Sequence, residues 1–161
     1  MKKRLLITVI ILTAMTVLLS SCGVSFDPRD FAEQNIKITL DDSFGRFEIN
    51  GYTVCYQSSL VTVYLLKEQF SESFSGDTTL DEYADLVLQA NSMTKEVKTI
   101  DHYKSFSYEY DVNDYVFHNE VFLYKMSDAF WIVRFECREE VYESLKPSID
   151  QWSSSVVENP K

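Results

Sequence analysis

Three segments in the C-terminal half of the chain constrain its fold most, because each has the pattern of a β-strand. They follow one another with short turns between them and span residues 104–112, 115–125 and 129–137. From Phe106 to Val112 apolar and polar residues alternate, which is the two-residue period of a strand with one buried face. Trp131, Val133 and Phe135 likewise share one face of the third segment. Strands joined by short turns pair antiparallel, so these segments predict an antiparallel sheet.

Five shorter segments add strands to this predicted sheet. They lie at residues 36–40, 44–50, 52–56, 61–66 and 95–100. Asn50-Gly51 joins the second of them to the third. This dipeptide favours the two-residue type I′ turn, in which both positions need a positive φ. The sequence therefore predicts a tight hairpin at Asn50-Gly51.

Two segments have helical periodicity instead. The first spans residues 80–93, and Thr79 with Glu82 three residues later forms the pattern of a capping box at its start. The second begins near Arg138 and carries one apolar stripe, made of Val141, Leu145, Ile149 and Trp152. Pro147 removes a backbone donor, so we expect the second helix to break or kink there, with Pro147 opening a short further helix.

The order of elements is strands, helix, strands, helix, and each helix has one apolar stripe to bury against a sheet. This order predicts an α+β domain, with an antiparallel sheet of about six or seven strands flanked by helices. A length of 161 residues fits one domain. We expect a leader, a tether, a single domain and a short tail, at residues 1–21, 22–35, 36–157 and 158–161.

The first residues have the organisation of a secretory signal peptide. Basic residues 2–4 precede an uncharged run at 5–19, which is shorter than the ~20 residues of a membrane-spanning helix. The run ends in Leu19-Ser20-Ser21-Cys22, which resembles the lipobox of bacterial lipoproteins. The resemblance implies recognition of Leu19, Ser20 and Ser21 by the signal peptidase, cleavage before Cys22, and a diacylglycerol on the Cys22 sulfur.

Such a protein is anchored to a bacterial cell membrane and exposed on its extracytoplasmic face. The net charge of −10 becomes −13 once the three basic residues of the leader are removed. An acidic chain of this kind is unsuited to nucleic acid, whose phosphates are neutralised by Lys and Arg. Anionic lipid headgroups also repel it, so we expect the acyl chains alone to hold it on the membrane.

Several stretches also resemble the PsbP-like family, which includes bacterial lipoproteins of the DcrB type. The resemblance lies in residues 80–84, 105–110, 122–124 and 130–135, and in a closing helix that contains Pro147 and Ser153-Ser154. It implies an α/β/α sandwich around an antiparallel sheet. It also implies a non-enzymatic role as an accessory or assembly factor of a membrane complex.

We find no residue pattern of a catalytic, cofactor or metal site. No serine lies in a Gly-x-Ser-x-Gly motif, and no Gly-rich phosphate loop is present. His102 and His118 form no short-range ligand pair with each other or with a cysteine. We therefore expect no enzyme activity, no cofactor and no metal.

Cys55 and Cys137 leave two alternatives open. Disulfides persist outside the cell, so the two residues can form one bond. Free cysteine is also among the most buried residue types, so they can equally be two separate buried thiols.

The sequence leaves two functions open as well. The first is a non-catalytic binding or accessory module that contacts a protein partner in the cell envelope. The alternative is a small-ligand-binding lipoprotein that uses a pocket between sheet and helices. The aromatic residues of the three long strands are expected to form the sheet core, or else to place tyrosines on a binding surface of the less covered face.

Overall fold

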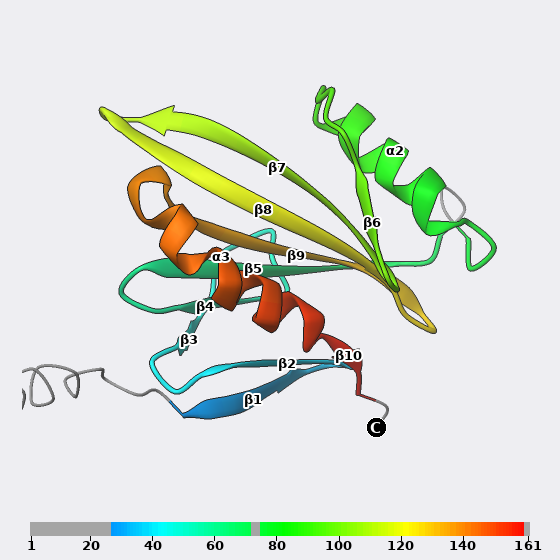
Figure 1. Ribbon diagram of the computed structural model, residues 1–161. Helices are drawn as coiled ribbons and strands as arrows, with labels where there is room; N and C mark the ends of the chain where they lie inside the picture. Colours follow the sequence, from blue (N-terminus) through cyan, green and yellow to red (C-terminus); the bar gives the residue numbers. More distant parts are fainter. Residues whose placement is uncertain (1–26, 72–74, 160–161) are drawn as a thin grey trace, which may run out of the picture.

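The computed structural model describes residues 27–71 and 75–159, which form two antiparallel sheets and two helices (Figure 1). The predicted leader lies outside the described residues, and so does the lipobox with Leu19, Ser20, Ser21 and Cys22. Within the described residues, no helix is both long and apolar enough to cross a bilayer.

The larger sheet has seven strands in the order β3-β4-β5-β9-β8-β7-β6. Its strands are β3 (Gly45–Phe47), β4 (Val54–Gln57), β5 (Val61–Gln69), β6 (Lys98–Ile100), β7 (Tyr103–Val112), β8 (Tyr115–Lys125) and β9 (Ala129–Arg138). All neighbours pair antiparallel, which confirms the predicted fold class. The three long predicted strands are β7, β8 and β9, at nearly the predicted bounds.

A smaller sheet was not expected from the sequence. It has the order β1-β2-β10 and consists of β1 (Pro28–Glu33), β2 (Ile36–Asp41) and β10 (Val157–Glu158). The prediction of a tether over 22–35 is therefore wrong for residues 28–33, which pair along their whole length with β2. Part of the chain beyond Ser153 also belongs to this sheet, because β10 pairs with β2. Proline is tolerated at the first position of an edge strand, which is where Pro28 lies.

The type I′ turn lies at a different place from the predicted one. At Asn50-Gly51 only Gly51 has a positive φ, and the Tyr52 amide donates to the Ile49 carbonyl, as in a type II turn. That turn belongs to a longer loop between β3 and β4. Asn113 and Asp114 have φ values of 48° and 68° and alone link the paired Val112 and Tyr115. The tight hairpin is thus the one between β7 and β8.

Helix α2 (Leu80–Ala90) begins with the predicted capping box. The Thr79 hydroxyl accepts from the Glu82 amide, and the Glu82 carboxylate accepts from the Thr79 amide. The helix ends three residues before the predicted Met93. Ser92 takes a positive φ of 53°, and the Met93 amide donates to the Leu88 carbonyl, which together form a Schellman motif.

Helix α3 (Glu139–Ser154) continues through Pro147, so the predicted division into two helices is wrong. Pro147 lies on the exposed side of the helix. Solvent can therefore reach the Glu143 carbonyl, which loses its helical donor. On the other side Ile149 is buried and Leu145 and Trp152 pack against the core, so tertiary contacts hold the helix on both sides of the proline.

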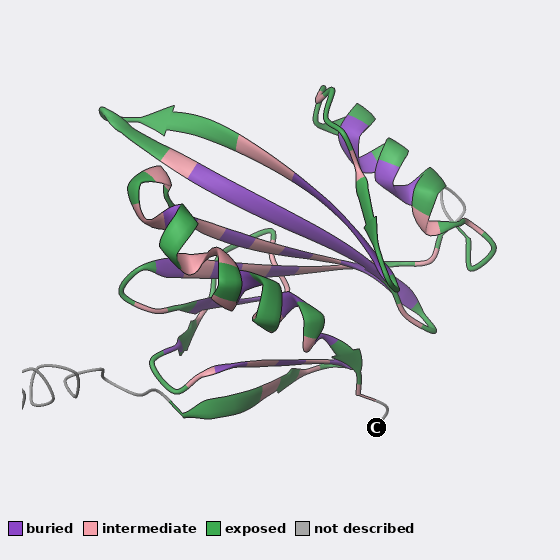
Figure 2. Cartoon of the chain, viewed as in Figure 1, coloured by how far each residue is buried: buried purple, intermediate pink, exposed green. Residues whose placement is uncertain are grey.

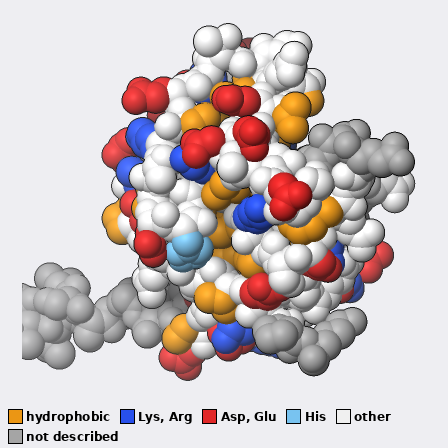
Figure 3. Space-filling model, turned by 90° about the vertical axis from the view of Figure 1, so that its right-hand side faces the viewer, with side chains coloured by type: hydrophobic (Ala, Val, Ile, Leu, Met, Phe, Trp, Pro, Cys, Tyr) orange, Lys and Arg blue, Asp and Glu red, His pale blue; other side chains and the backbone are white. Residues whose placement is uncertain are grey.

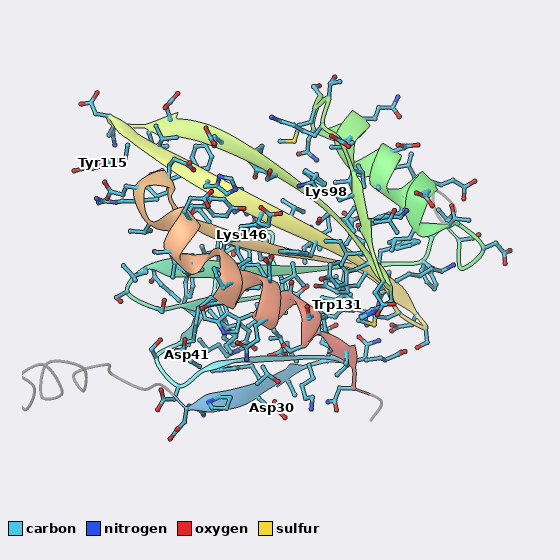
Figure 4. All side chains as sticks on the ribbon, in the orientation of Figure 1. Asp30, Asp41, Lys98, Tyr115, Trp131 and Lys146 are labelled. Atoms are coloured by element: carbon cyan, nitrogen blue, oxygen red, sulfur yellow. The ribbon has the colours of Figure 1, made fainter. Side chains whose placement is uncertain are left out.

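The two faces of the large sheet are covered differently (Figures 1 and 2). Helix α3 and the small sheet cover one face, where β2, β4, β5, β8, β9 and α3 contribute to one buried cluster. Trp131, labelled in Figure 4, is fully buried in this cluster. Helix α2 packs on the opposite face, against β7 and β8, and buries a smaller cluster with Tyr83 and Phe130. We call the first side the closed face and the second the open face.

Candidate functional site

A cavity of about 610 Å³ lies on the open face, between α2 and residues of β5, β7, β8 and β9. Its helix side includes the apolar Leu86, Val87 and Ala90 together with the polar Gln89. Its sheet side combines tyrosine rings with the side chain of Arg134. A volume of this size lies in the range of small-molecule sites, which are mostly apolar with a few polar groups.

Strand register brings the sheet side of the cavity together. Tyr64 in β5 pairs with Arg134 in β9, and Arg134 pairs with Val121 in β8. Paired residues of adjacent strands project to the same face of a sheet. Ile132 and Arg134 of β9 therefore face the cavity. Trp131, the residue before Ile132, projects to the closed face.

Among the described residues, Arg134 is the one basic side chain that lines this cavity. Its guanidinium carbon lies 4.1 Å from the centre of the Tyr64 ring and 5.4 Å from that of Tyr52. Nη1 donates to the Tyr108 hydroxyl at 3.2 Å, and Nη2 lies 3.7 Å from a carboxylate oxygen of Glu136. Nε is buried and has no hydrogen-bond partner among the described residues. The Nε of Arg134 is thus a buried donor without an acceptor among the described residues.

Glu136 is held by two tyrosines beside the cavity. The Tyr64 hydroxyl donates to one carboxylate oxygen at 3.0 Å and the Tyr110 hydroxyl to the other at 2.8 Å. Burial, helped by the charge of Glu136, raises the pKa of Tyr64 to about 12. Tyr64 is therefore a neutral donor at physiological pH, and its ring stays in place beneath Arg134.

A second carboxylate faces the cavity from β5. Glu68 lines it and accepts a hydrogen bond of 2.8 Å from the Tyr83 hydroxyl of α2. The Tyr83 ring stacks on Phe130 with 4.0 Å between ring centres. Burial raises the pKa of Tyr83 far above its ordinary value, so the hydroxyl remains a donor. This bond ties α2 to the sheet and fixes one wall of the cavity.

A second polar site lies on the closed face, at the other end of β8. His118 is 7% exposed, and its Nδ1 lies 2.9 Å from Glu139 and 3.6 Å from Glu109. Its Nε2 lies 3.4 Å from Glu120. The Tyr142 ring stacks on the imidazole with 3.4 Å between ring centres. We call Glu109, His118, Glu120 and Glu139 the His118 cluster.

His102, by contrast, is an exposed residue of the β6–β7 turn. Its Nδ1 lies 3.1 Å from the adjacent Asp101 carboxylate. Each of the two histidines therefore has acidic neighbours of its own: Asp101 at His102, and three glutamates at His118.

Cys55 and Cys137 are free, buried thiols on opposite faces of the large sheet. Cys55 pairs with Tyr64 on the open face, whereas Cys137 lies in the core cluster of the closed face. The sheet therefore separates the two sulfurs, and the structure has the two separate thiols rather than the disulfide. Burial raises the pKa of Cys55. Burial together with the charge of Glu139 raises the pKa of Cys137 to about 11.

Sequence reasoning did not find Arg134 or the His118 cluster. Arg134 lies 70 positions from its ring partner Tyr64, and no local pattern marks such a pair. The idea of tyrosines on the less covered face did point in the right direction, since Tyr52, Tyr64 and Tyr108 line the cavity.

No protein-family model matches the chain, and a search of curated proteins finds no match. A crystal structure of a protein from Bacteroides thetaiotaomicron VPI-5482 is similar, with a TM-score of 0.60 and 7% identity. The similarity covers 83% of this chain and 49% of that chain, so this chain spans about half the length of that protein. The solution structure of cyanobacterial PsbP (CyanoP) from Synechocystis sp. PCC 6803 gives a TM-score of 0.44 at 12% identity, covering 87% of this chain and 98% of that chain.

The first similarity supports the fold: an antiparallel seven-stranded sheet with a smaller sheet and two helices. It says nothing of function, because 7% identity carries no information on side chains of a site. Membership of the PsbP-like family stays a prediction.

Proposed function

We propose that this chain is a lipid-anchored extracytoplasmic binding protein whose cavity on the open face takes a small, largely apolar molecule. The observation that carries the proposal is the pairing of an apolar cavity of about 610 Å³ with the unpartnered Nε of Arg134. Of the two functions left open by the sequence, this geometry favours the small-ligand alternative. The mechanism is binding without chemistry.

The cavity favours a ligand with an aromatic or aliphatic body and one acceptor group. Burial of the body against Leu86, Val87 and Ile132 supplies ~25 cal/mol per Å² of apolar surface. An anionic or carbonyl oxygen accepts from the Nε of Arg134 and leaves no buried donor unpaired. The rings of Tyr52 and Tyr64 keep the guanidinium from moving toward solvent.

A titration with 8-anilinonaphthalene-1-sulfonate tests this proposal, because the probe has an aromatic body and an anionic acceptor. We expect saturable binding of one probe per chain, and Arg134→Gln to weaken it by about tenfold or more, as for loss of one charge-assisted hydrogen bond. Arg138→Gln is the matched control, since Arg138 also lies in β9 with its guanidinium 4.1 Å from a tyrosine ring, that of Tyr115. Equal weakening by both variants would contradict the proposal.

Ala90→Trp provides a second variant that leaves Arg134 intact. Ala90 lines the cavity from the exposed side of α2, so an indole there fills space without disturbing the buried helix face. We expect it to abolish probe binding while the far-ultraviolet circular dichroism and unfolding curve stay unchanged.

The anchor is proposed from the sequence and has its own test. Cys22→Ser removes the nucleophile that would carry the lipid, so we expect an unprocessed precursor that incorporates no labelled fatty acid. High salt should leave the native protein on the membrane. Normal processing of the variant, or release of the native protein by salt alone, would disprove the anchoring.

A second candidate function, contact with an envelope protein, is supported by the tip of the β7–β8 hairpin. The tip carries four exposed large hydrophobic residues, Tyr110, Val112, Tyr115 and Val116. Tyr115, 49% exposed, is labelled at the outer end of the hairpin in Figure 4. A photo-crosslinking residue at Tyr115 should trap one partner in native membranes, whereas the same residue at the exposed Leu60 should not. Equal labelling at both positions would count against this role.

A further inference from the structure

The His118 cluster joins side chains from three elements that are distant in sequence. Glu109 belongs to β7, His118 to β8, and Glu139 is the first residue of α3. Glu109 and His118 are direct cross-strand partners. One ligand-type atom from each residue lies within 4.8 Å of the other two. We propose that Glu109, His118 and Glu139 form a binding site for a divalent transition-metal ion, of which Zn²⁺ is the best match.

The distances fit such an ion. Nδ1 of His118 lies 2.9 Å from Glu139 and 3.6 Å from Glu109. Zn–N and Zn–O bonds of ~2.0–2.1 Å at tetrahedral angles place ligand atoms roughly 3.3 Å apart. The observed separations bracket that value, so small rotations of the two carboxylates complete the site.

The imidazole is already oriented as a ligand. Its second nitrogen, Nε2, faces the buried Glu120 carboxylate at 3.4 Å. Glu120 in turn accepts a hydrogen bond of 2.9 Å from the Tyr142 hydroxyl, and the Tyr142 ring covers the imidazole. A carboxylate on the far nitrogen fixes the tautomer and raises the basicity of a metal-binding histidine. Nδ1 is thereby left for the metal.

The charge of the cluster also calls for a cation. Glu109, Glu120 and Glu139 place three carboxylates around one imidazole, and among the described residues none of the three has an ion pair with a lysine or arginine. Glu120 is only 8% exposed, and a buried carboxylate without a compensating charge is costly. The chain as a whole is acidic, and acidic side chains are spread over the face in Figure 3. A dication would balance the local excess.

The ligand types select the metal. Imidazole nitrogen with carboxylate oxygen suits Zn²⁺ or Co²⁺, whereas Mg²⁺ and Ca²⁺ prefer oxygen ligands alone. The side chains of Glu109 and Glu139 are 54% and 41% exposed, so solvent reaches the site. Water can then supply the fourth ligand.

The expectation of no metal site rested on short-range spacing, and these residues lie 9 and 21 positions apart. The proposal is independent of the cavity, because the His118 cluster lies on the closed face. Its failure would leave the proposed ligand binding untouched.

Isothermal titration of the detergent-solubilised full chain with ZnCl₂ tests the site. We expect one ion per chain, no comparable binding of MgCl₂, and at least a 100-fold loss of affinity in His118→Gln. Glu120→Gln should weaken binding by about 10- to 100-fold, as for other residues behind a ligating histidine. His102→Gln is the matched control and should leave the affinity unchanged, because the exposed His102 has Asp101 as its one acidic partner among the described residues.

A measurement on the native chain keeps the proposal testable if His118→Gln does not fold. Imidazole ¹⁵N spectra resolve two histidines, since the chain has only two. Zn²⁺ should shift the His118 Nδ1 signal at one equivalent and leave His102 in place. Absence of binding at one equivalent, equal shifts at both histidines, or unchanged affinity in a folded His118→Gln or Glu109→Gln variant would overturn the proposal.

Discussion

The closed and open faces of the large sheet are built from the same strands but end in different structures. On the closed face Trp131, Val133 and Phe135 are covered by other elements and are at most 1% exposed. On the open face the intervening Ile132 and Arg134 are only half-buried, because α2 packs mainly on β7 and β8 and leaves these side chains partly uncovered. The difference teaches that the length and position of the covering helix decide which side chains of a sheet are buried in the core and which are left to line a binding surface.

The largest effect should come from truncating the closed face. Trp131→Ala removes a fully buried indole, and we expect it to lower the free energy of unfolding by ~3–5 kcal/mol. Ile132→Ala, one residue further and facing the cavity, should cost roughly half as much or less, because its side chain is only partly packed. Urea unfolding of both variants measures the difference, and equal losses would break the distinction between the two faces.

A smaller effect is expected at the start of α2, the helix that forms one wall of the cavity. Thr79→Ala removes the hydroxyl that accepts from the Glu82 amide, so we expect a loss of ~1 kcal/mol in unfolding free energy. Thr79→Ser keeps the acceptor and is the control. The same loss in both variants would show that the cap does not account for the stability of α2.

Strand periodicity and capping were predictable because both are local. Alternation placed β7, β8 and β9, and the spacing of Thr79 and Glu82 placed the start of α2. The small sheet was not predictable, because β1 becomes a strand only through pairing with β2 and carries no clear alternation of its own. Turn dipeptides were ambiguous too, since Asn113-Asp114 forms a type I′ turn whereas Asn50-Gly51, a dipeptide that favours this turn, does not.

The candidate site was the least predictable part, for a physical reason. Arg134 meets Tyr64, and His118 meets Glu109, through strand register, which depends on every paired residue of both strands. A single sequence gives the face of a strand on which a side chain lies. It does not give the residue opposite.

A loss of stability at alkaline pH should involve both faces. Burial raises the pKa of Cys137 from 9.0 to about 11 on the closed face and that of Tyr64 from 10.0 to about 12 at the cavity. Both groups are neutral when protonated, so the folded state favours the protonated form. Their contribution is complete below pH 9 and is lost as the pH rises through the folded values.

Unfolding free energies between pH 7 and pH 11 check this expectation. They should be nearly constant to about pH 9 and fall above it. Cys137→Ala should make that fall shallower, while Cys55, whose pKa is also raised by burial, keeps the onset near pH 9. A fall of the same size in Cys137→Ala would show that this thiol does not contribute.

The central claim is that the open face holds a small molecule, and native mass spectrometry of the chain purified from its native host tests it most directly. The account predicts a mass excess of one small molecule per chain, which survives in Arg138→Gln and is absent in the folded Ala90→Trp variant. An unliganded mass in the native chain together with no saturable probe binding, or the same mass excess in Ala90→Trp, would contradict it.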